Sequence, residues 1–436
     1  MLQCDAKLRE SVVVRPIAID LFSGAGGMSL GLEQAGFDVV AAVESDPVHA
    51  ATHEFNFPEC ETICASVVDV DGAFIRERSG IGSQTVDLVA GGPPCQGFSM
   101  IGKRIISDDR NSLVMDFQRI VVELKARMFI MENVPGMAVG AQGEVLSELA
   151  RRFTRDGYRC LPIFLLTATS FGVPQKRRRL FFVGVREGES LPILQFDAPD
   201  TCPTVWDAIG DLPEIETFPE LLDRDWIEAR FGEPSSYASE LRGSVRGLTD
   251  FSYRRKWDAN ILTSSSRTVH TPRSIRRFSS TRPGKVEPTS RFLRLDPDGF
   301  CNTLRAGTDG KRGSFTSPRP IHPYVARVIT VREGARLQSF PDWFRFHETK
   351  WHGFRQVGNA VAPLVGRAVG SSIRNALGYS ASRPRRMLTL GDPGLLAMTM
   401  TQAAEYFEVQ PRIARSLKTP SPLVARTASS SNGKSS

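Results

Sequence analysis

The sequence predicts an α/β protein built on a doubly wound sheet, with a second, smaller domain. Three observations support this fold class. Short apolar runs typical of buried strands alternate with helical patterns between residues 12 and 131. Glycine-rich or polar residues follow these runs, at the sheet edge where open α/β sheets bind their ligands. The chain has 436 residues, of which 41% are hydrophobic, which is enough for a large core and two domains.

Net charge and cysteine usage indicate the kind of partner and compartment. The formal net charge of +7 points to a polyanionic partner. The seven cysteines are scattered and odd in number, which favours a reducing compartment such as the cytoplasm. The first residues lack the apolar core of a signal peptide, and no apolar run reaches the length of a membrane span, so no membrane association is expected.

A glycine-rich loop after the first strand predicts a ligand cradle. The strand is expected over 12–19 and the loop over Asp20–Gly27, followed by a helix. A second strand over 39–43 ends in Glu44, twenty residues after the first glycine of the loop, where a carboxylate can hold the two hydroxyls of a ribose. Ser29 stands in place of the third glycine of a dinucleotide fingerprint, which argues against a nicotinamide oxidoreductase. The alternative is a surface turn followed by a solvated glutamate.

The next helix is expected to be capped by Asp46, to start at Pro47 and to end near Phe55, with a third strand over 62–65. Four residues that often bind zinc lie on this helix or after it, namely His49, His53, Cys60 and Cys64. Because the two cysteines fall in a loop and a strand rather than in a paired knuckle, we predict no metal site.

Two later strands end in residues that can carry chemistry. The run 86–90 leads into Gly91–Ser99, which places Cys95 on a stiff Pro-Pro turn facing a crevice. A helix then leads to a strand over 128–131 that is followed by Glu132. In a doubly wound sheet these strand ends share one edge, so a nucleophile and an acid would face a ribose-binding cofactor. The alternatives are a small buried cysteine and a helix-capping carboxylate.

Five segments, in order, resemble the motifs of DNA (cytosine-5) methyltransferases. They are Asp20–Gly27, Gly91–Ser99, Glu132–Val134, Gln175–Arg179 and Gly358–Val361. The likeness covers about residues 15 to 375, and five ordered motifs are far more specific than one. The resemblance implies a Rossmann-like methyltransferase domain, S-adenosylmethionine as cofactor, and methylation of carbon 5 of a cytosine in a short specific sequence of duplex DNA.

The resemblance also implies a mechanism and its residues. In this family a cysteine thiolate adds to carbon 6 of cytosine, and the resulting enamine accepts the methyl group at carbon 5. Cys95 matches that nucleophile, and Glu132 matches the glutamate that protonates or hydrogen-bonds N3 of the ring. Arg177 and Arg179 would hold the base carbonyl, the glutamate and a nearby phosphate. Because 180–185 reads as a strand, a basic edge strand is the alternative for these two arginines.

The cofactor residues implied by the resemblance come from both ends of the family domain. They are Phe22, Ser23, Gly24, Gly26, Glu44, Ser45, Ser66, Pro94, Leu113, Asn359 and Val361. Ser45 stands where the family often has a bulky adenine contact, and Ser66 stands where it has an acid. Asp69 is near enough in sequence to replace that acid, so the adenine contacts stay open.

Domain boundaries follow from the motifs and from a change in composition. We expect a catalytic domain over 1–192 and 341–380, a mostly loop and β target-recognition domain over 193–340, and a partly disordered extension over 381–436. Residues 96–110 resemble the family's flexible basic loop, which closes over a flipped-out base; the alternative is a mobile surface loop.

Partner binding is expected in the basic part of the recognition domain. Residues 253–327 carry sixteen Lys and Arg against five Asp and Glu, a net charge of +11, and lack helical periodicity, so loops and short strands are expected. The candidate contacts to DNA are Arg276, Arg277, Arg305, Lys311, Arg312 and Arg319. Six apolar residues between 278 and 304 argue against the alternative of a disordered basic linker.

Two segments near the end of the chain are expected to be structural. The segment 328–341 resembles the motif that packs the recognition region onto the catalytic one, with Ala335, Leu337 and Phe340 in the core. Residues 401–415 faintly suggest a helix-turn-helix, but an accessory helix over 401–407 with a disordered tail from about Ser429 is the preferred interpretation.

Two other functions are possible for this fold. A relative that acts on transfer RNA is disfavoured by the long basic insert between Gln175 and Gly358, and a catalytically dead binding module is disfavoured by the presence of Cys95 and Glu132. The chain can belong to a restriction-modification system, with a cognate restriction endonuclease, or be solitary. A monomer associated with the nucleoid is expected, because one active site is enough to methylate one strand at a time.

Overall fold

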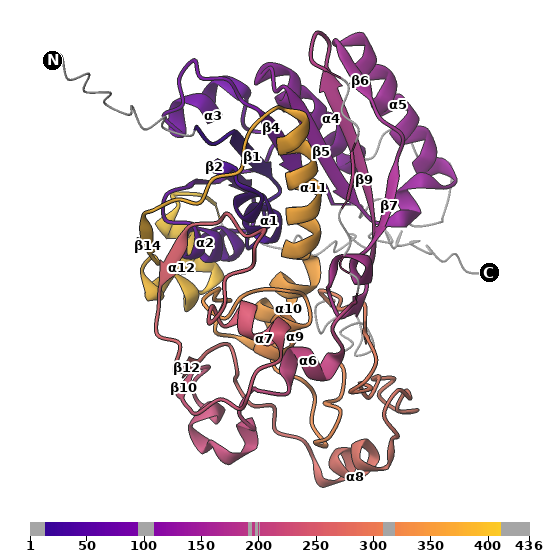
Figure 1. Ribbon diagram of the computed structural model, residues 1–436, viewed down its shortest axis with the longest axis vertical. Helices are drawn as coiled ribbons and strands as arrows, with labels where there is room; N and C mark the ends of the chain where they lie inside the picture. The colour runs from indigo at the N-terminus through magenta and orange to yellow at the C-terminus, as the bar shows by residue number, and fades with distance from the viewer. Residues whose placement is uncertain are drawn as a thin grey trace, which may run out of the picture.

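The computed structural model describes residues 14–94, 109–190, 194–196, 199, 201–307 and 319–410. Its centre is an eight-stranded sheet (Figure 1). The strands are β1 (Ile17–Leu21), β2 (Asp38–Glu44), β3 (Glu61–Cys64), β4 (Leu88–Gly91), β5 (Met128–Asn133), β6 (Tyr158–Cys160), β7 (Phe164–Thr167) and β9 (Arg178–Arg186). The first strand begins at Ile17 rather than at residue 12 or soon after, since Pro16, which has no N–H to donate, stands before it.

The sheet has the order β3-β2-β1-β4-β5-β9-β6, with β7 also paired to β9. The first five strands are parallel, and β9 runs antiparallel to β5, β6 and β7. The strand order reverses between β1 and β4, and in such sheets ligands bind at the carboxyl ends of the strands beside this switch point. The predicted doubly wound α/β fold is confirmed.

Helices cover both faces of the sheet, as Figure 1 shows. One face packs against α3 (Gly72–Arg78), α4 (Asp109–Glu123) and α5 (Ala141–Arg155). The other face packs against α1 (Gly27–Ala35) and α11 (Pro363–Ala376). Alternation along β5 follows from strand geometry: Phe129 and Met131 enter the first core, while Met128 and Ile130 enter the second.

The far end of the chain returns to its beginning through the contact between α1 and α11. A Cβ on Gly31 would lie 2.7 Å from the Cα of Gly366, and a Cβ on Gly370 would lie 2.8 Å from the Cβ of Ala35. Glycine at these positions lets the two helix backbones touch. A larger side chain at either place would push α11 away from the start of the catalytic domain.

The second lobe consists mostly of loops with short helices and short strands. Its elements are α6 (Val205–Ile209), β10 (Ile227–Glu228), α7 (Ser236–Leu241), β11 (Arg254–Lys256), β12 (Ile261–Leu262), α8 (Pro272–Ser280), β13 (Cys301–Asn302), α9 (Val331–Arg336) and α10 (Lys350–Asn359). Helix α8 differs from the expectation of loops and short strands. Thr271 caps it and Pro272 begins it, but only Phe278 of its nine residues is buried, so the sequence carries no apolar period.

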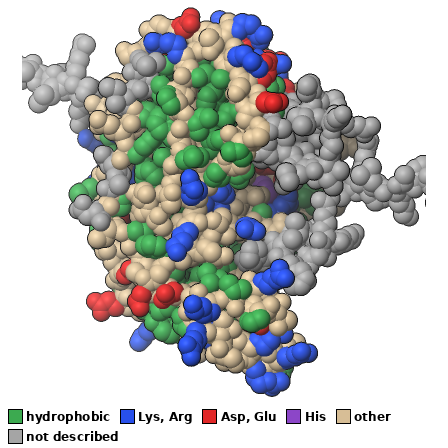
Figure 2. Space-filling view, turned by 90° about the vertical axis from the view of Figure 1, so that its right-hand side faces the viewer, with side chains coloured by type: hydrophobic (Ala, Val, Ile, Leu, Met, Phe, Trp, Pro, Cys, Tyr) green, Lys and Arg blue, Asp and Glu red, His purple; other side chains and the backbone are tan. Residues whose placement is uncertain are grey.

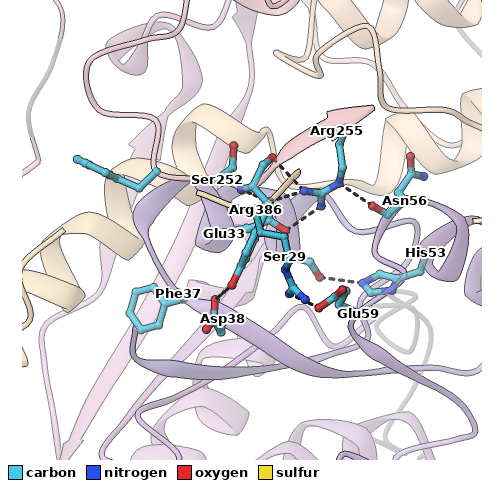
Figure 3. Close-up of polar contacts among 12 residues, drawn as sticks. Ser29, Glu33, Phe37, Asp38, His53, Asn56, Glu59, Ser252, Arg255 and Arg386 are labelled. Atoms are coloured by element: carbon cyan, nitrogen blue, oxygen red, sulfur yellow. Dashed lines mark hydrogen bonds and ion pairs between the residues drawn. The ribbon is translucent and has the colours of Figure 1, made fainter. Parts of the chain in front are cut away.

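Residues 251–256, inside the range 193–340 expected for the recognition domain, pack against α1 instead. Arg255 forms a buried ion pair with Glu33 (Nη2–Oε2 2.8 Å), and the backbone N–H of Tyr253 donates to the same carboxylate (3.0 Å; Figure 3). Strand β11 pairs in parallel with β14 (Met387–Thr389). Residues 251–256 therefore join the second lobe and the C-terminal extension to α1, the helix that follows β1.

The C-terminal extension is folded through residue 410. Leu395 and Leu396 pack against Ala51 and Phe55 of α2 (Pro47–Asn56), and α12 (Met400–Tyr406) also lies on α2. The predicted accessory helix is confirmed, while the predicted tail lies outside the described residues. None of the helices described in the structure is both long and apolar enough to cross a membrane.

A buried arginine on α9 joins two distant segments of the second lobe. Ala335, Leu337 and Phe340 are fully buried, which confirms their prediction as core. Arg336 is also fully buried and pairs with Asp342 (Nε–Oδ1 2.6 Å) and with Asp211 (Nη1–Oδ1 3.0 Å). Two buried carboxylates thus share one guanidinium as their closest counter-charge.

Replacing Arg336 by methionine is expected to lower the free energy of unfolding by about 3–5 kcal/mol, since Asp211 and Asp342 stay buried and lose their closest counter-charge. Only the longer pairs with Arg242 (3.6 Å) and Arg332 (3.7 Å) remain. Chemical denaturation followed by tryptophan fluorescence measures the loss. Arg151→Met is the matched control, because Arg151 is an exposed residue on α5 and its pairing with Glu148 is worth little. A loss for Arg336→Met no larger than that of the control would contradict the assigned role.

Candidate functional site

The residues expected to bind a ligand or take part in a reaction lie together at the carboxyl ends of β1, β2, β4 and β5. Residues 22–26 follow β1, Glu44 ends β2, Gly92 follows β4, and Glu132 is the penultimate residue of β5. Since β1, β4 and β5 are adjacent and parallel, their ends meet at the switch point. The structure therefore brings the predicted loop, ribose acid and general acid to one edge.

The glycine-rich loop is held in an open conformation. Phe22 has φ +59°, which is uncommon for a bulky residue, and Gly24 and Gly26 also have positive φ. The backbone N–H of Gly24 donates to Oε2 of Glu44 (2.8 Å), and that of Asp46 donates to Oε1 (2.7 Å). These bonds fix the Glu44 carboxylate beside the loop, while a Cβ on Gly24 would meet only open space.

One side chain of the loop lacks a hydrogen-bond partner. The Oγ atom of Ser23 is buried and finds no acceptor or donor among the residues that the structure describes. A buried hydroxyl without a partner is costly, and a polar ligand group in the cradle would satisfy it. The loop, the carboxylate and this hydroxyl are consistent with a ligand that carries a ribose and further polar groups.

A buried hydrogen-bonded chain supports the loop from below. Ser29 donates to Oδ2 of Asp20 (2.6 Å) and accepts from Nε2 of His53 (3.0 Å), whose Nδ1 accepts from Thr62 (3.1 Å). Burial lowers the pKa of His53 to about 3, so its imidazole is neutral at physiological pH. Burial also raises the pKa of Asp20 to about 7. In the described ranges, no group of three or more His, Cys, Asp or Glu is placed to hold a metal.

The side chain of Glu132 lies at the centre of the edge. Its Oε1 is 2.8 Å from Nε of Arg179, and both side chains are largely buried. A Cβ on Gly92 would lie 3.2 Å from Oε2 of Glu132, so the chain leaving β4 passes directly over the carboxylate. Burial raises the pKa of Glu132, with Arg179 and Arg177 opposing that rise.

Asn133 fixes the turn that leads to the predicted nucleophile. Its Nδ2 donates to the carbonyl of Pro93 (3.0 Å), and its Oδ1 accepts from the N–H of Val134 (2.8 Å). Cys95 itself lies outside the described residues.

Arg177 is held by backbone carbonyls that come from distant parts of the chain. Its guanidinium is almost fully buried and donates to Leu304 (3.0 Å), Gly358 (3.0 Å) and Ala360 (2.8 Å). It therefore joins the start of β9 to the second lobe and to the segment before α11. Of the two predicted arginines, Arg179 contacts Glu132 and Arg177 holds the surrounding backbone.

The other expected cofactor residues lie around the same edge. Ser45 and Ser66 follow the paired ends of β2 and β3, and both are half-buried. Pro94 is exposed and Leu113 is half-buried on α4. Asn359 is exposed, while a Cβ on Gly27 would lie 2.4 Å from the carbonyl oxygen of Val361, which places the start of α11 directly against the glycine loop.

The predicted DNA contacts fall into three groups. Arg276 is exposed on α8, whereas Nε of the neighbouring Arg277 lies 3.5 Å from Glu287. Arg305 is exposed where the recognition lobe meets Gly358, and Arg319 lies over the ring of Phe354 (4.8 Å). Lys311 and Arg312 lie outside the described residues.

Sequence reasoning missed several residues that hold the site in place. Gln175 is fully buried; it donates to Oε1 of Gln338 (2.7 Å) and accepts from the N–H of Leu304 (3.1 Å). Gln338 donates in turn to the carbonyl of Ala360 (2.7 Å). Gln175 and Asn133 stand inside motifs that were singled out, but the motif alone does not say that their amides bind backbone.

The fold and the site define a Rossmann-like methyltransferase, and comparison with known proteins gives the family. The family described as C-5 cytosine-specific DNA methylase matches residues 17–375. The chain belongs to this family and is a DNA (cytosine-5) methyltransferase. The Type II methyltransferase M.XorII of Xanthomonas oryzae pv. oryzae is 55% identical over 91% of this chain and 93% of its own length. M.AgeI of Thalassovita gelatinovora is 31% identical over 82% and 99%.

Solved structures agree with this assignment. A protein described as a DNA modification methyltransferase encoded within a prophage of E. coli has 35% sequence identity and a TM-score of 0.70, covering 83% of this chain and 99% of that one. The Dnmt2 methyltransferase of S. pombe has 17% identity and a TM-score of 0.52, covering 84% and 100%. The second likeness shows the shared fold.

Proposed function

We propose that this chain transfers a methyl group from S-adenosylmethionine to carbon 5 of a flipped-out cytosine in a short specific sequence of duplex DNA. The observation that carries the proposal is the buried Glu132–Arg179 pair, which lies against Gly92 just before the turn that leads to Cys95. This pair supports the proposal because an acid with a raised pKa lies beside the chain segment that precedes Cys95 in the sequence. That pairing is what addition to an electron-rich pyrimidine needs.

The residues present fit the cofactor. The carboxylate of Glu44, fixed by two backbone N–H groups, would accept the ribose hydroxyls, and the unpartnered Oγ of Ser23 would meet a polar group of the ligand. Phe22, Gly24 and Gly26 would form the cradle, with Ser45 and Ser66 toward the adenine. Pro94, Leu113, Asn359 and Val361 would close its walls. When bound, S-adenosylmethionine supplies a methyl group activated by its sulfonium.

The residues of the chain would act on the base in a series of steps. The Cys95 thiolate forms a bond to carbon 6 of cytosine while Glu132 delivers its proton to N3, which yields an enamine. Carbon 5 of the enamine attacks the methyl group. A base then removes the proton from carbon 5, the bond between sulfur and carbon 6 breaks, and N3 returns its proton to Glu132. Arg179 would keep the carboxyl of Glu132 oriented throughout.

The target cytosine must leave the DNA duplex for this chemistry to occur, because carbon 6 of a stacked base is not accessible to a thiol. The basic second lobe would hold the duplex through Arg276, Arg277, Arg305, Lys311, Arg312 and Arg319. Relatives named as Type II methyltransferases support a role in restriction-modification, with a cognate endonuclease as partner. The enzyme would act as a monomer on DNA of the nucleoid, in the cytoplasm.

Transfer of labelled methyl from S-adenosylmethionine to unmethylated genomic DNA tests this function, with transfer RNA as the competing substrate. Sites are mapped by cytosine-conversion sequencing. We expect 5-methylcytosine at one short recurrent sequence of DNA and no label in RNA. Label in transfer RNA alone would overturn the proposed substrate, while label on DNA at a position other than carbon 5 would overturn the proposed chemistry.

Replacing Glu44 by glutamine is expected to weaken binding of S-adenosylmethionine roughly 10- to 100-fold, since a charge-assisted acceptor for two hydroxyls becomes a neutral amide. Isothermal calorimetry measures the change. Glu59→Gln serves as the control, because Glu59 pairs with Arg386 at the exposed surface. An unchanged affinity for Glu44→Gln would remove Glu44 from the cofactor site.

A further inference from the structure

Helix α8 and the hairpin after it form a small lobe at the end of the molecule far from the catalytic sheet (Figure 1). A separate core of Phe278, Ile321 and Val328, with Phe292 and Ala326 against it, holds the lobe together. The bridge between Val286 and Leu293 closes the hairpin. The lobe is thus a built unit rather than a basic linker.

The surface of this lobe gathers free cations. Lys and Arg side chains cluster over the lower end of the molecule in Figure 2. Arg273, Arg276, Arg282 and Lys285 are all exposed. Arg276, Arg282 and Lys285 line an open hollow of about 560 Å³. Among the described residues, the side chains of these four form no ion pair and donate no hydrogen bond, whereas Arg277 is paired with Glu287.

The arrangement on the helix distinguishes the two neighbouring arginines that sequence alone could not separate. Arg273 and Arg276 are three residues apart, so they project from one face of α8. Arg277 turns toward Glu287, whose carboxylate also accepts from the N–H groups of Thr289 (3.0 Å) and Ser290 (2.6 Å). Arg273 and Arg276 are therefore available to a ligand, while Arg277 is half-buried and paired with Glu287.

One buried arginine fixes the direction of α8. Arg294 donates to three carbonyls at the end of the helix, those of Phe278 (2.9 Å), Ser279 (3.2 Å) and Thr281 (2.9 Å). It also donates to Pro323 (3.0 Å) and Tyr324 (3.1 Å) in the next segment. Its positive charge lies at the carboxyl end of the helix, where the helix dipole favours it. This single guanidinium connects the end of α8 to the rest of the lobe.

We propose that α8 is the helix with which this chain reads duplex DNA, that Arg273 and Arg276 are its specificity-determining residues, and that Arg294 is a positioning residue which aims the helix. The inference rests on the proposed function and names the part of the substrate-binding surface that selects the sequence. The major groove admits an α-helix, and arginine donates two hydrogen bonds to guanine there. Charge complementarity between four free cations and the phosphate backbone favours this occupant.

Methylation of unmethylated genomic DNA, mapped by cytosine-conversion sequencing, tests the two reading residues. Arg273→Ala and Arg276→Ala are each expected to lower the rate at the preferred sequence roughly 5- to 150-fold and to relax the preference at one base pair. Arg151→Ala, on the outer helix α5, is the control and keeps both rate and sequence. If both α8 variants methylate the same sequence at the wild-type rate, the inference is wrong even though the proposed function stands.

A uniform loss of affinity for all sequences, with the preferred sequence unchanged, would also overturn the reading role, because it is the signature of phosphate contacts alone. The dependence of binding on salt separates these outcomes. Absence of methyl transfer by the unmodified protein, in contrast, would refute the proposed function and not the location of the reading helix.

Arg294→Met and Arg294→Lys test the positioning role. Both variants are expected to raise the KM for DNA at least about 10-fold and to broaden the methylated sequences, with lysine keeping part of the selectivity. Binding of S-adenosylmethionine and the melting temperature of the catalytic domain should not change. Loss of cofactor binding together with DNA binding would show a merely structural role. Unchanged sequence preference in Arg294→Met would overturn the positioning role.

Discussion

Replacing Cys95 by serine should reduce methyl transfer to DNA by roughly 10⁴-fold or more. A serine hydroxyl remains protonated at neutral pH and is a far weaker nucleophile than a thiolate, so the ring would not be activated at carbon 5. Two contacts hold the chain that precedes Cys95. Asn133 donates a hydrogen bond to Pro93, and Gly92 lies against Glu132. These contacts fix the chain before Cys95 beside the buried acid.

The measurement is single-turnover transfer of labelled methyl to DNA, with binding of S-adenosylmethionine and of duplex determined separately. Both affinities should stay near the wild-type values in Cys95→Ser. The matched control is Cys160→Ser, a half-buried free thiol on β6 at the far side of the sheet. Substantial activity in Cys95→Ser would sink the covalent mechanism.

Glu132→Gln should lower the turnover number by about 10²- to 10⁴-fold, which is the usual contribution of a general acid or base. Glutamine keeps the size and an oxygen that can contact Arg179, but it has no proton to deliver to N3 of the base. Because burial raises the pKa of Glu132, its protonated form persists to higher pH than for an exposed glutamate. The wild-type rate should therefore fall as pH rises through that raised pKa.

The pH profile is the decisive readout. In Glu132→Gln the alkaline decline that belongs to Glu132 should vanish, while the residual rate still rises with formation of the Cys95 thiolate. Affinity for duplex DNA should change little. Glu148→Gln, at an exposed surface pair on α5, provides the control. An identical pH profile in Glu132→Gln and wild type would exclude proton delivery by this residue.

The strand ends were predictable because each strand carries two signals. Val89, Ala90 and their neighbours form a short apolar run, and the glycines and prolines after it terminate it. Similar pairs of signals mark the ends of β1, β2 and β5. Parallel connection then brings Glu44, Glu132 and the glycine loop together without any further information. The edge of the sheet thus followed from local patterns and one topological rule.

The recognition lobe was not predictable in the same way. Helix α8 buries one side chain of nine, so it has no period to read, and its structure depends on Arg294 sixteen residues beyond Phe278. Arg336 and Arg177 are buried although arginine is most often exposed. Each has partners more than a hundred residues away along the chain, such as Asp211 for Arg336 and the carbonyl of Leu304 for Arg177. No local sequence pattern indicates such partners.

The contact of α11 with the first glycine loop has a consequence for synthesis of the protein. The carbonyl of Val361 lies against Gly27, and the backbones of α1 and α11 meet at Gly31 and Gly366. A ribosome releases the loop, the nucleophile and the whole recognition lobe before it completes α11. A prematurely terminated product would carry the chemistry without the last wall of its pocket. We therefore expect methyl transfer to require near completion of the polypeptide.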